Sequence, residues 1–398
     1  MNTSTYHCLL ASAILLLLAS CSHNTAYIKP GIPQEAQPEP ALESVTQRLI
    51  LIGDAGEPFK NPKASVLAQL SQRANELSDR TTVLFLGDNI YPAGLPAEDA
   101  PNRAQMEAKI LQQIEAVLQS GANGIFVPGN HDWNYSRVGG QAAVQRQQQF
   151  VEARLGKNSF FPQNGCPGPV KLDLSTIRLL IIDTEWWLHK HEKGTSSCFA
   201  SDPPESEQAT KGRIIRELQE QIKSAGDRQV IIVGHHPLAT HGPHGGFFDW
   251  KDHIFPLTVA KDWLWIPLPV VGSLYPILRW NVLRHPQDLS GAVNKEMVQR
   301  LKAAIATAAK PVIYAAGHDH GLQVLRGKDP LAYVLVSGAG AEKKITKVGH
   351  GDDTYFAHVQ PGFMVLDMLA NGSVFLRVVE KNKGGSGYKQ AFSYWLLQ

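Results

Sequence analysis

Short runs of apolar residues recur along the chain, and most of them lack the polar alternation of a half-buried strand. A short continuous run of Val, Ile and Leu predicts a strand that is buried on both faces of a sheet. Five such runs lead to a glycine followed by polar residues, and they span residues 49–52, 83–86, 125–127, 230–233 and 312–316. Further strands are predicted at residues 170–174, 177–182, 333–337, 362–369 and 373–379.

Several stretches between these runs carry apolar residues three or four positions apart. This spacing predicts amphipathic helices whose apolar side covers a sheet. The helices are predicted at residues 64–77, 103–118, 141–155 and 207–223. Strand and helix patterns follow one another without a clean break, so we expect one mixed α/β domain over residues 45–398, with one large insertion at about residues 245–290.

Residues 255–280, inside the insertion, are unusually rich in aromatic residues and proline. Four prolines exclude a continuous membrane helix. Three tryptophans and a tyrosine with basic residues nearby are typical of a segment at a membrane interface. The alternative, which we favour, is an internal lid or subsidiary core packed on the rest of the domain.

Polar residues with metal-binding side chains follow the five continuous runs. The segments are Gly53-Asp54, Gly87-Asp88-Asn89-Ile90-Tyr91, Gly129-Asn130-His131-Asp132, Gly234-His235-His236-Pro237 and Gly317-His318-Asp319-His320. An Asp after a single buried strand is usually a helix cap, so the prediction depends on the whole set. Open α/β sheets place their sites at the carboxyl ends of strands, and a site for two cations needs a bridging carboxylate with imidazole and oxygen ligands. The set therefore predicts a binuclear metal centre.

The order of these five segments resembles that of the calcineurin-like metallophosphoesterases. Tyr91, three residues after Asp88, narrows the resemblance to the purple acid phosphatases, and especially to their small tartrate-resistant type. The resemblance implies a four-layer α/β/β/α sandwich, with the large insertion added in this chain. It also implies hydrolysis of a phosphate ester, in the first place a phosphomonoester, by a metal-bound hydroxide.

The same resemblance implies a role for each metal-binding side chain. One metal would be bound by Asp54, Tyr91 and His320, the other by Asn130, His235 and His318, and Asp88 would bridge the two. A phenolate is a hard, electron-rich donor, so Tyr91 favours trivalent iron. The expected cofactors are two metal ions, Fe(III) with a divalent Fe, Zn or Mn ion. The alternative for Tyr91 is a packing residue in a turn.

Further histidines near these segments are candidates for contact with the substrate. His131 follows a predicted ligand, and it could contact the phosphate or protonate the leaving group, with Asp132 fixing its tautomer. His241 is similar to a second active-site histidine of the family, but the family's spacing from His235 fits His244 better. The sequence leaves the choice between His241 and His244 open.

The first twenty residues contain no Lys, Arg, Asp or Glu, and residues 9–19 are apolar. This run is too short for a stable membrane span and is typical of a secretory signal peptide. The segment Leu18-Ala19-Ser20-Cys21 resembles a bacterial lipobox, so we expect residues 1–20 to be a lipoprotein signal peptide and Cys21 to be lipidated. Residues 21–44 are polar and rich in Pro, Gln and Glu, and they predict a flexible tether.

Ser22 after the cysteine resembles lipoproteins that are sent to the outer membrane. The expected location is therefore the outer membrane, facing the periplasm. The alternative is an ordinary signal peptide cleaved near Ala19 or Ser20, which would leave Cys21 as a free thiol.

Cys166 and Cys198 are the two cysteines that follow the N-terminal segment. In an oxidising periplasm they are a natural pair. The chain-entropy model gives about 3.5–4 kcal/mol of stabilisation for a closed loop of about 33 residues. The alternative is two separate buried thiols.

The formal net charge is +2, and no block of basic residues stands out. This argues against a dedicated nucleic-acid surface. A phosphodiesterase or pyrophosphate hydrolase that acts on a membrane lipid or a nucleotide is an alternative function, favoured by the anchor and the aromatic insertion. The alternative from another class is a binding lipoprotein that has kept the fold and lost activity, although all seven ligand types are present.

Overall fold

The computed structural model describes residues 25–35, 37–57, 61, 64–194, 196–199, 206–259, 263–341, 345–382 and 387–398. The expected signal peptide and Cys21 lie outside the described residues. The described start of the expected tether is attached to the domain, because strand β1 (Tyr27–Ile28) pairs with β11 (Thr354–His358). The prediction of a flexible tether is therefore wrong for β1, since Tyr27 and Ile28 complete the edge of a sheet.

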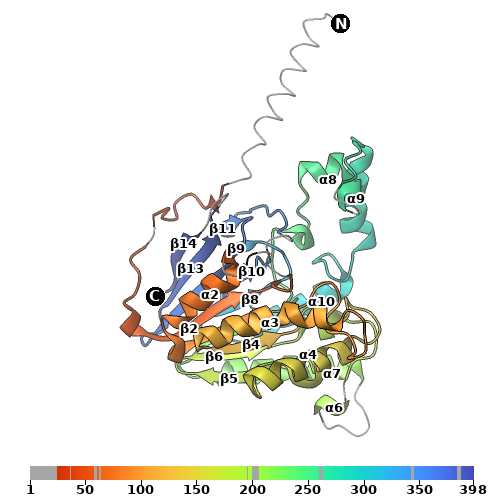
Figure 1. Cartoon of the computed structure of the whole chain (residues 1–398). Coiled ribbons are helices and arrows are strands. Elements are labelled where there is room, and N and C mark those ends of the chain that lie inside the picture. Colours follow the sequence, from red (N-terminus) through yellow and green to blue (C-terminus); the bar gives the residue numbers. More distant parts are fainter. Residues whose placement is uncertain are drawn as a thin grey trace, which may run out of the picture.

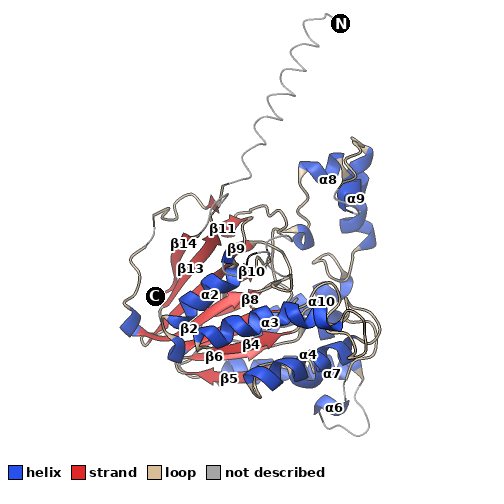
Figure 2. Cartoon of the chain, viewed as in Figure 1, coloured by secondary structure: helices blue, strands red, loops and turns tan. Residues whose placement is uncertain are grey.

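The described strands form two mixed sheets, one of eight strands and one of six (Figure 2). The larger sheet also contains β5 (Val170–Leu174), β6 (Ile177–Ile181), β7 (Gln229–Val233), β8 (Val312–Ala316), β9 (Leu322–Arg326) and β10 (Leu331–Ser337). The smaller sheet contains β2 (Val45–Ile52), β3 (Thr81–Leu86), β4 (Asn123–Val127), β12 (Gly362–Leu369), β13 (Val374–Lys381) and β14 (Tyr388–Leu397). The strand order is β1-β11-β9-β10-β8-β7-β6-β5 in the larger sheet and β14-β13-β12-β2-β3-β4 in the smaller sheet. Strands β2, β3 and β4 pair in parallel, and so do β6, β7 and β8.

Alternate residues of the central strands point into different layers of the protein. Leu49 and Leu51 of β2 belong to the apolar cluster that fills the space between the two sheets, and so does Leu84 of β3. Their neighbours Ile50 and Ile52 belong to a second cluster, which they form with residues of the helices. Both faces of these strands are thus buried, which explains the continuous apolar runs in the sequence.

Helices cover the outer faces of both sheets (Figure 1) and complete the predicted four-layer α/β/β/α sandwich. The α-helices are α2 (Val66–Asn75), α3 (Arg103–Ser120), α4 (Gly140–Leu155), α5 (Thr184–Leu188), α6 (Ser196–Phe199), α7 (Glu207–Lys223), α8 (Trp250–Ile254), α9 (Leu274–Leu278) and α10 (Ala292–Ile305). Helices α2 and α3 contact the smaller sheet, and the apolar sides of α7 and α10 join the outward side chains of β7 and β8. Short 3-10 turns are η2 (Leu42–Ser44), η4 (Ser78–Arg80), η5 (Gln163–Gly165), η6 (Pro243–Gly245), η7 (Pro256–Val259) and η8 (Val271–Ser273), and η9 (Arg279–Leu283) is a π-helical turn.

The predicted strands and helices are present, with ends that differ by a few residues. The apolar pattern does not predict β9 and β11, because polar residues interrupt both. Gln323 of β9 and His358 of β11 are nevertheless buried, since each finds a hydrogen-bond partner inside the protein.

A buried ion cluster joins three strands of the smaller sheet. Arg48 of β2, Asp367 of β12 and Arg377 of β13 are fully buried. Asp367 accepts hydrogen bonds from Arg48 Nε at 2.7 Å and from Arg377 Nη1 at 2.5 Å. Glu76 and Glu39 pair with the two arginines from the surface, so both guanidinium groups are balanced by carboxylates.

The insertion forms a lobe that projects from the sandwich around α8 and α9 (Figure 1). Many of its apolar side chains are exposed, to 73% for Trp263 and 84% for Val270. The prediction of a subsidiary core packed on the domain is therefore wrong for this lobe. Among the described residues, no helix has the length and apolar character needed to cross a membrane.

Cys166 and Cys198 form the predicted disulfide, with their Cα atoms 5.6 Å apart. The bond joins the segment before β5 to helix α6. The alternative of two separate thiols is thereby excluded.

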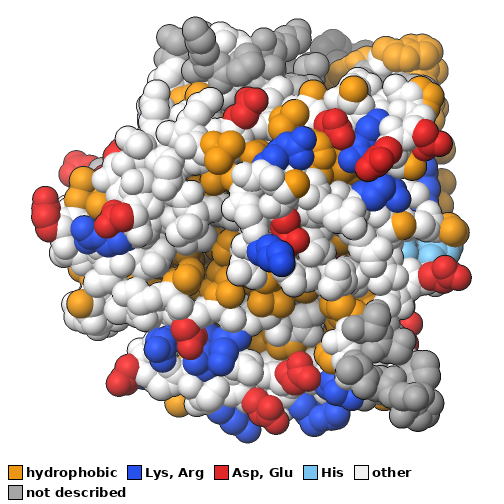
Figure 3. All heavy atoms as spheres, turned by 60° about the horizontal axis from the view of Figure 1, so that its bottom comes forward, with side chains coloured by type: hydrophobic (Ala, Val, Ile, Leu, Met, Phe, Trp, Pro, Cys, Tyr) orange, Lys and Arg blue, Asp and Glu red, His pale blue; other side chains and the backbone are white. Residues whose placement is uncertain are grey.

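Charged side chains are mixed on the face of the molecule that Figure 3 shows. Lys and Arg side chains lie among Asp and Glu side chains, and apolar atoms appear between them. This face therefore has no extended field of one sign.

Candidate metal centre

The five predicted ligand segments follow strands that belong to different sheets. Strands β2, β3 and β4 of the smaller sheet lead to Asp54, Asp88 and Asn130, and strands β7 and β8 of the larger sheet lead to His235 and His318. Because the sheets face each other, the carboxyl ends of these strands meet at one edge of the sandwich. Side chains that lie far apart in the sequence are thereby brought into contact.

Asp54, Tyr91 and His320 form one group of donor atoms. The Tyr91 hydroxyl donates a hydrogen bond to Asp54 Oδ1 at 3.0 Å and lies 3.1 Å from His320 Nε2. His320 Nε2 is in turn 3.3 Å from Asp54 Oδ1. A carboxylate, a phenol oxygen and an imidazole nitrogen thus meet at one point, as the donor set of a metal ion does.

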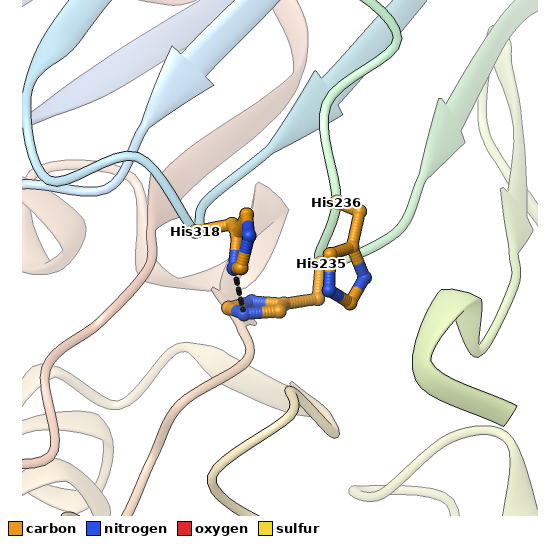
Figure 4. A group of neighbouring side chains, drawn as sticks. All are labelled: His235, His236 and His318. Atoms are coloured by element: carbon orange, nitrogen blue, oxygen red, sulfur yellow. Dashed lines mark hydrogen bonds between the residues drawn. The ribbon is translucent and has the colours of Figure 1, made fainter. Parts of the chain in front are cut away.

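Asn130, His235 and His318 form a second group. Asn130 Oδ1 lies 3.0 Å from His235 Nε2 and 3.2 Å from His318 Nδ1, and these two ring nitrogens are 3.2 Å apart (Figure 4). The other nitrogen of each ring contacts a backbone carbonyl, of Leu86 for His235 and of Gln287 for His318. A metal ion binds the neutral form of an imidazole. In that form, with this nitrogen donating to the carbonyl, each ring would turn its unprotonated nitrogen toward the group.

Asp88 lies between the two groups. One of its oxygens is 3.4 Å from His235 Nε2, and its carboxylate also interacts with the Tyr91 hydroxyl. Burial raises the pKa of the Asp88 carboxyl, but positive charge on His235 and His131 outweighs burial and holds this pKa below its ordinary value. A charged carboxylate is therefore kept where a bridging ligand between two ions would lie.

The backbone is strained at three of these residues. Asp54, Asp88 and His318 have φ angles of 61°, 54° and 70°, in the left-handed region. This conformation is uncommon for residues other than glycine, and such strain is concentrated at functional sites. The surrounding structure must therefore hold these three side chains in place against the local preference of the chain.

Glycines allow the ligand loops to approach one another. A Cβ atom at Gly87 would lie 2.5 Å from His235 Nδ1, and one at Gly129 would lie 2.4 Å from Asp88 Oδ1. Gly87 also has a φ of 93°, which favours glycine. The glycines before the ligands thus make room for the neighbouring loop, in addition to turning the backbone.

Comparison with known proteins assigns the family. A family model described as calcineurin-like phosphoesterase matches residues 47–264, which is more than half of the chain. The chain belongs to the calcineurin-like phosphoesterases.

Relatives of this phosphoesterase include acid phosphatases. It is 25% identical to purple acid phosphatase 17 of Arabidopsis thaliana, over 86% of this chain and 82% of that protein. It is 24% identical to tartrate-resistant acid phosphatase type 5 of Rattus norvegicus, over 74% of this chain and 72% of that protein. Among solved structures, GAP50, the anchor in the inner membrane complex of Plasmodium, matches 89% of both chains with a TM-score of 0.50 and 17% identity, which shows the fold alone.

His236 of this phosphoesterase lies beside His235 and His318 (Figure 4), but its ring nitrogens contact other residues. A ring nitrogen of His236 does lie within 4.8 Å of those of His235 and His318. However, its Nδ1 is 2.8 Å from the Thr184 hydroxyl and its Nε2 is 2.5 Å from Gln287 Oε1. His236 therefore connects the loops behind the centre, which agrees with its omission from the predicted ligands.

Asp132 does not have the predicted contact with His131. Its carboxylate accepts hydrogen bonds from the backbone N–H groups of Asn89 and Gly129, among others. The Nδ1 of His131 instead lies 2.5 Å from the carbonyl of Pro92. The prediction that Asp132 fixes the tautomer of His131 is wrong, because Asp132 points into the protein and ties two ligand loops together.

His244 and His241 have different neighbours in this phosphoesterase. The His244 ring lies 3.9 Å from the His318 ring, and its Nδ1 is 2.8 Å from Asp288. The Nε2 of His241 is 2.6 Å from Asp353. Of the two candidate histidines, the fold thus brings His244 into contact with the predicted ligand His318.

Arg279 and Asp288, at the end of the insertion, were not predicted as site residues. Arg279 donates hydrogen bonds to both oxygens of Asp288, at 2.9 and 2.8 Å. Burial raises the pKa of Asp288, but hydrogen bonds from His244 and Arg279 outweigh it and lower this pKa to about 2. No sequence signal marks these residues, because their roles depend on contacts between distant segments.

A cavity of about 720 Å³ opens beside the centre. Its lining includes the predicted site residues Asp88, Asn130, His131, His244, His318 and His320. It also includes Tyr275, Arg279 and Leu283 of the insertion. The insertion therefore forms one wall of the cavity.

Proposed function

We propose that this chain is a phosphomonoesterase of the purple acid phosphatase type that uses two metal ions. The position of Tyr91 carries the proposal, because its hydroxyl lies next to Asp54 and His320 instead of packing in a turn. A phenol oxygen beside a carboxylate and an imidazole suits trivalent iron. The similarity to purple and tartrate-resistant acid phosphatases supports the same function.

In this proposal each of the two groups would hold one ion, Fe(III) with Tyr91 and a divalent Fe, Zn or Mn ion with Asn130, and Asp88 would serve as the shared ligand. When bound, the two cations would hold a phosphate and lower the pKa of a water. The donor types and the orientation of the imidazole rings support this assignment. Four of the seven residues also line the cavity, so a phosphate can reach them.

His131 and His244 are proposed to act on the substrate. Both line the cavity, and the Nδ1 of each is held by another group, the Pro92 carbonyl for His131 and Asp288 for His244. The Nε2 of each ring is proposed to bind a phosphate oxygen or to give a proton to the leaving group. In His131 this nitrogen lies 3.8 Å from Asp88 Oδ2, at the proposed bridge between the two ions. Arg279 fixes Asp288 and thereby positions His244.

Turnover of an aryl phosphate monoester and of the corresponding diester tests the function. The chain loaded with iron and zinc is expected to hydrolyse the monoester faster. Asp88→Asn is expected to abolish turnover and to lower the metal content, because an amide bridges two cations poorly compared with a carboxylate. Asp227→Asn, at an exposed position, is the matched control. Near-normal turnover with two metals per chain in Asp88→Asn would contradict the binuclear centre.

A phosphodiesterase or pyrophosphate hydrolase acting on a membrane lipid or a nucleotide is the second candidate. The observation that favours it is the wall of the cavity formed by Tyr275, Arg279 and Leu283, which adds aromatic, basic and apolar groups for a larger substrate. A diester rate above the monoester rate would decide for this candidate. Two bound metals without any turnover would favour an inactive binding lipoprotein.

We also propose that the protein is an exported lipoprotein, anchored through Cys21 in the outer membrane and facing the periplasm. The apolar run at residues 9–19 and the segment that ends in Cys21 support the proposal, and the disulfide agrees with an oxidising compartment. Cys21→Ala is expected to abolish incorporation of labelled fatty acid. A wild type with a free Cys21 thiol would contradict lipidation.

A further inference from the structure

The projecting lobe carries most of the exposed apolar surface. Sixteen large apolar side chains are exposed among the described residues, and twelve of them belong to residues 250–283. The most exposed are Trp263 (73%), Trp265 (53%), Val270 (84%), Val271 (60%), Val282 (65%) and Leu283 (71%). We call the surface of these six side chains the crest. Soluble proteins rarely leave so much apolar surface together, so the crest requires an occupant.

The composition around the crest fits a bilayer interface. Its two tryptophans combine an apolar ring with an N–H donor, as side chains at the level of lipid headgroups do. Lys251 Nζ lies 4.3 Å from the centre of the Trp265 ring, and Arg284 is exposed next to Leu283. Residues 250–284 contain four Lys or Arg residues and two acidic residues. Lys251 and Arg284 lie beside side chains of the crest, and these two basic groups favour a surface of anionic phospholipids.

The lobe projects from the same side of the molecule as the N-terminal end of the described chain, where the proposed lipid anchor would be attached. In Figure 1 the first described residues, beside β11, and the lobe with α8 and α9 both lie on the upper side of the molecule. Thr25 follows Cys21 by four residues, and the apolar run at residues 9–19 precedes it. A membrane that holds this end of the chain therefore faces the same side as the crest.

The crest is continuous with the cavity beside the metal centre. Leu283 belongs to the crest and also lines the cavity, together with Tyr275 and Arg279 of the same lobe. Arg279, His244 and His318 line the same cavity as Leu283. An apolar substrate tail resting on the crest would leave its phosphate near these residues.

We propose that the crest docks on a phospholipid bilayer and presents the metal centre to phosphate esters that lie in the membrane surface. The docking step is independent of metal binding and of turnover. The substrate class rests on the proposed function, because it assumes that the centre hydrolyses phosphate esters.

Quenching of tryptophan emission by the bilayer tests the docking step. The full chain is mixed with vesicles of phosphatidylethanolamine and phosphatidylglycerol that carry bromine atoms on their acyl chains. Trp263 and Trp265 are expected to be quenched, since bromine quenches only indoles that reach the acyl region. This measurement needs neither bound metals nor turnover, and an N-terminal anchor does not by itself bring the two tryptophans into the bilayer.

The test variant combines Val270→Asp with Val271→Asp. Both side chains are exposed, and Val270 has a φ of 69°, a region that Asp tolerates better than Val, so the fold is expected to persist. The variant is expected to lose most of the quenching, because two charges would have to enter the interface. Leu118→Asp, at an exposed position of α3 outside the lobe, is the matched control and is expected to keep it.

Two results would overturn the docking proposal. One is equal quenching in the wild type and the Val270→Asp, Val271→Asp variant, with unchanged thermal unfolding. The other is a wild type that is not quenched by vesicles but is dimeric in ultracentrifugation, while the variant is monomeric. In that case a second copy of the chain covers the crest.

Rates on a phosphate monoester in the bilayer and in solution test the substrate class. Phosphatidic acid in vesicles and a soluble aryl phosphate serve as the two substrates. The ratio of the first rate to the second is expected to fall about tenfold in the variant, which corresponds to about 1.4 kcal/mol. An unchanged ratio would overturn the substrate class. A wild type that hydrolyses neither compound but is quenched would instead refute the proposed function and leave docking supported.

Discussion

Tyr91 is fully buried, and its hydroxyl lies 3.0 Å from Asp54 and 3.1 Å from His320. Tyr91→Phe removes that oxygen without opening a large cavity. An Fe(III)–phenolate pair absorbs visible light by charge transfer, so the wild type is expected to be purple to pink. The variant is expected to be colourless and to retain some activity with divalent metals. Visible absorption of both proteins, made in iron-replete cells, checks this prediction.

A colourless wild type that contains only zinc or manganese would contradict trivalent iron at Tyr91. The protein would then be a general divalent metallophosphoesterase. The other six ligand assignments do not depend on this result.

The two histidines after β7 provide a matched pair of variants. His244 lines the cavity and contacts His318, whereas His241 is outside that lining and pairs with Asp353. His244→Ala is expected to lower kcat on a phosphate monoester by about 100-fold. This value is at the lower end of the rate acceleration that a general acid or base usually contributes. His241→Ala is expected to change kcat little. Equal losses in the two variants would contradict the assignment of His244 to the site.

Among the secondary-structure elements, β2, β12 and β13 are joined by the buried ion cluster, which we expect to contribute to the free energy of unfolding. Asp367→Ala leaves the buried guanidinium groups of Arg48 and Arg377 without their shared carboxylate. Breaking a buried ion pair in this way costs about 3–5 kcal/mol of unfolding free energy. Urea unfolding of the wild type and the variant measures the loss.

The exposed pair of Asp227 and Lys310 is the control for this prediction. Surface ion pairs contribute little, so Asp227→Ala is expected to unfold at the same urea concentration as the wild type. An equal effect of Asp367→Ala and Asp227→Ala would show that the buried cluster does not stabilise the sheet.

At the scale of the whole molecule, the disulfide constrains a long loop. Cys166 and Cys198 are separated by 32 positions in the sequence. The chain-entropy model gives a loss of about 3.5–4 kcal/mol of unfolding free energy for the double variant Cys166→Ser, Cys198→Ser. Urea unfolding of the oxidised wild type, the reduced wild type and the variant checks this value. A reduced wild type as stable as the oxidised one would contradict it.

The amino-acid pattern was sufficient to predict a mixed α/β fold and the residue types of the proposed metal ligands, whereas the four-layer arrangement was expected from the family resemblance. Strands such as β2 and β8 are buried on both faces, so their sequences are continuously apolar and easily predicted. The proposed ligands directly follow these strands, so Asp54, Asp88 and His318 can be identified from the sequence as candidate ligands. The pairing of Cys166 and Cys198 is predictable because no other cysteine lies beyond the N-terminal segment.

The contacts between side chains of distant segments depend on how the two sheets pack. The donors come from two sheets, and contacts across the interface place His244, rather than His241, beside His318. The same contacts turn Asp132 inward and bring Asp288 to His244. The exposure of Val270 was also not predictable, because an apolar sequence is equally compatible with a core and with an exposed surface. Local sequence sets the type of each element, but the neighbours of a side chain depend on how distant elements pack.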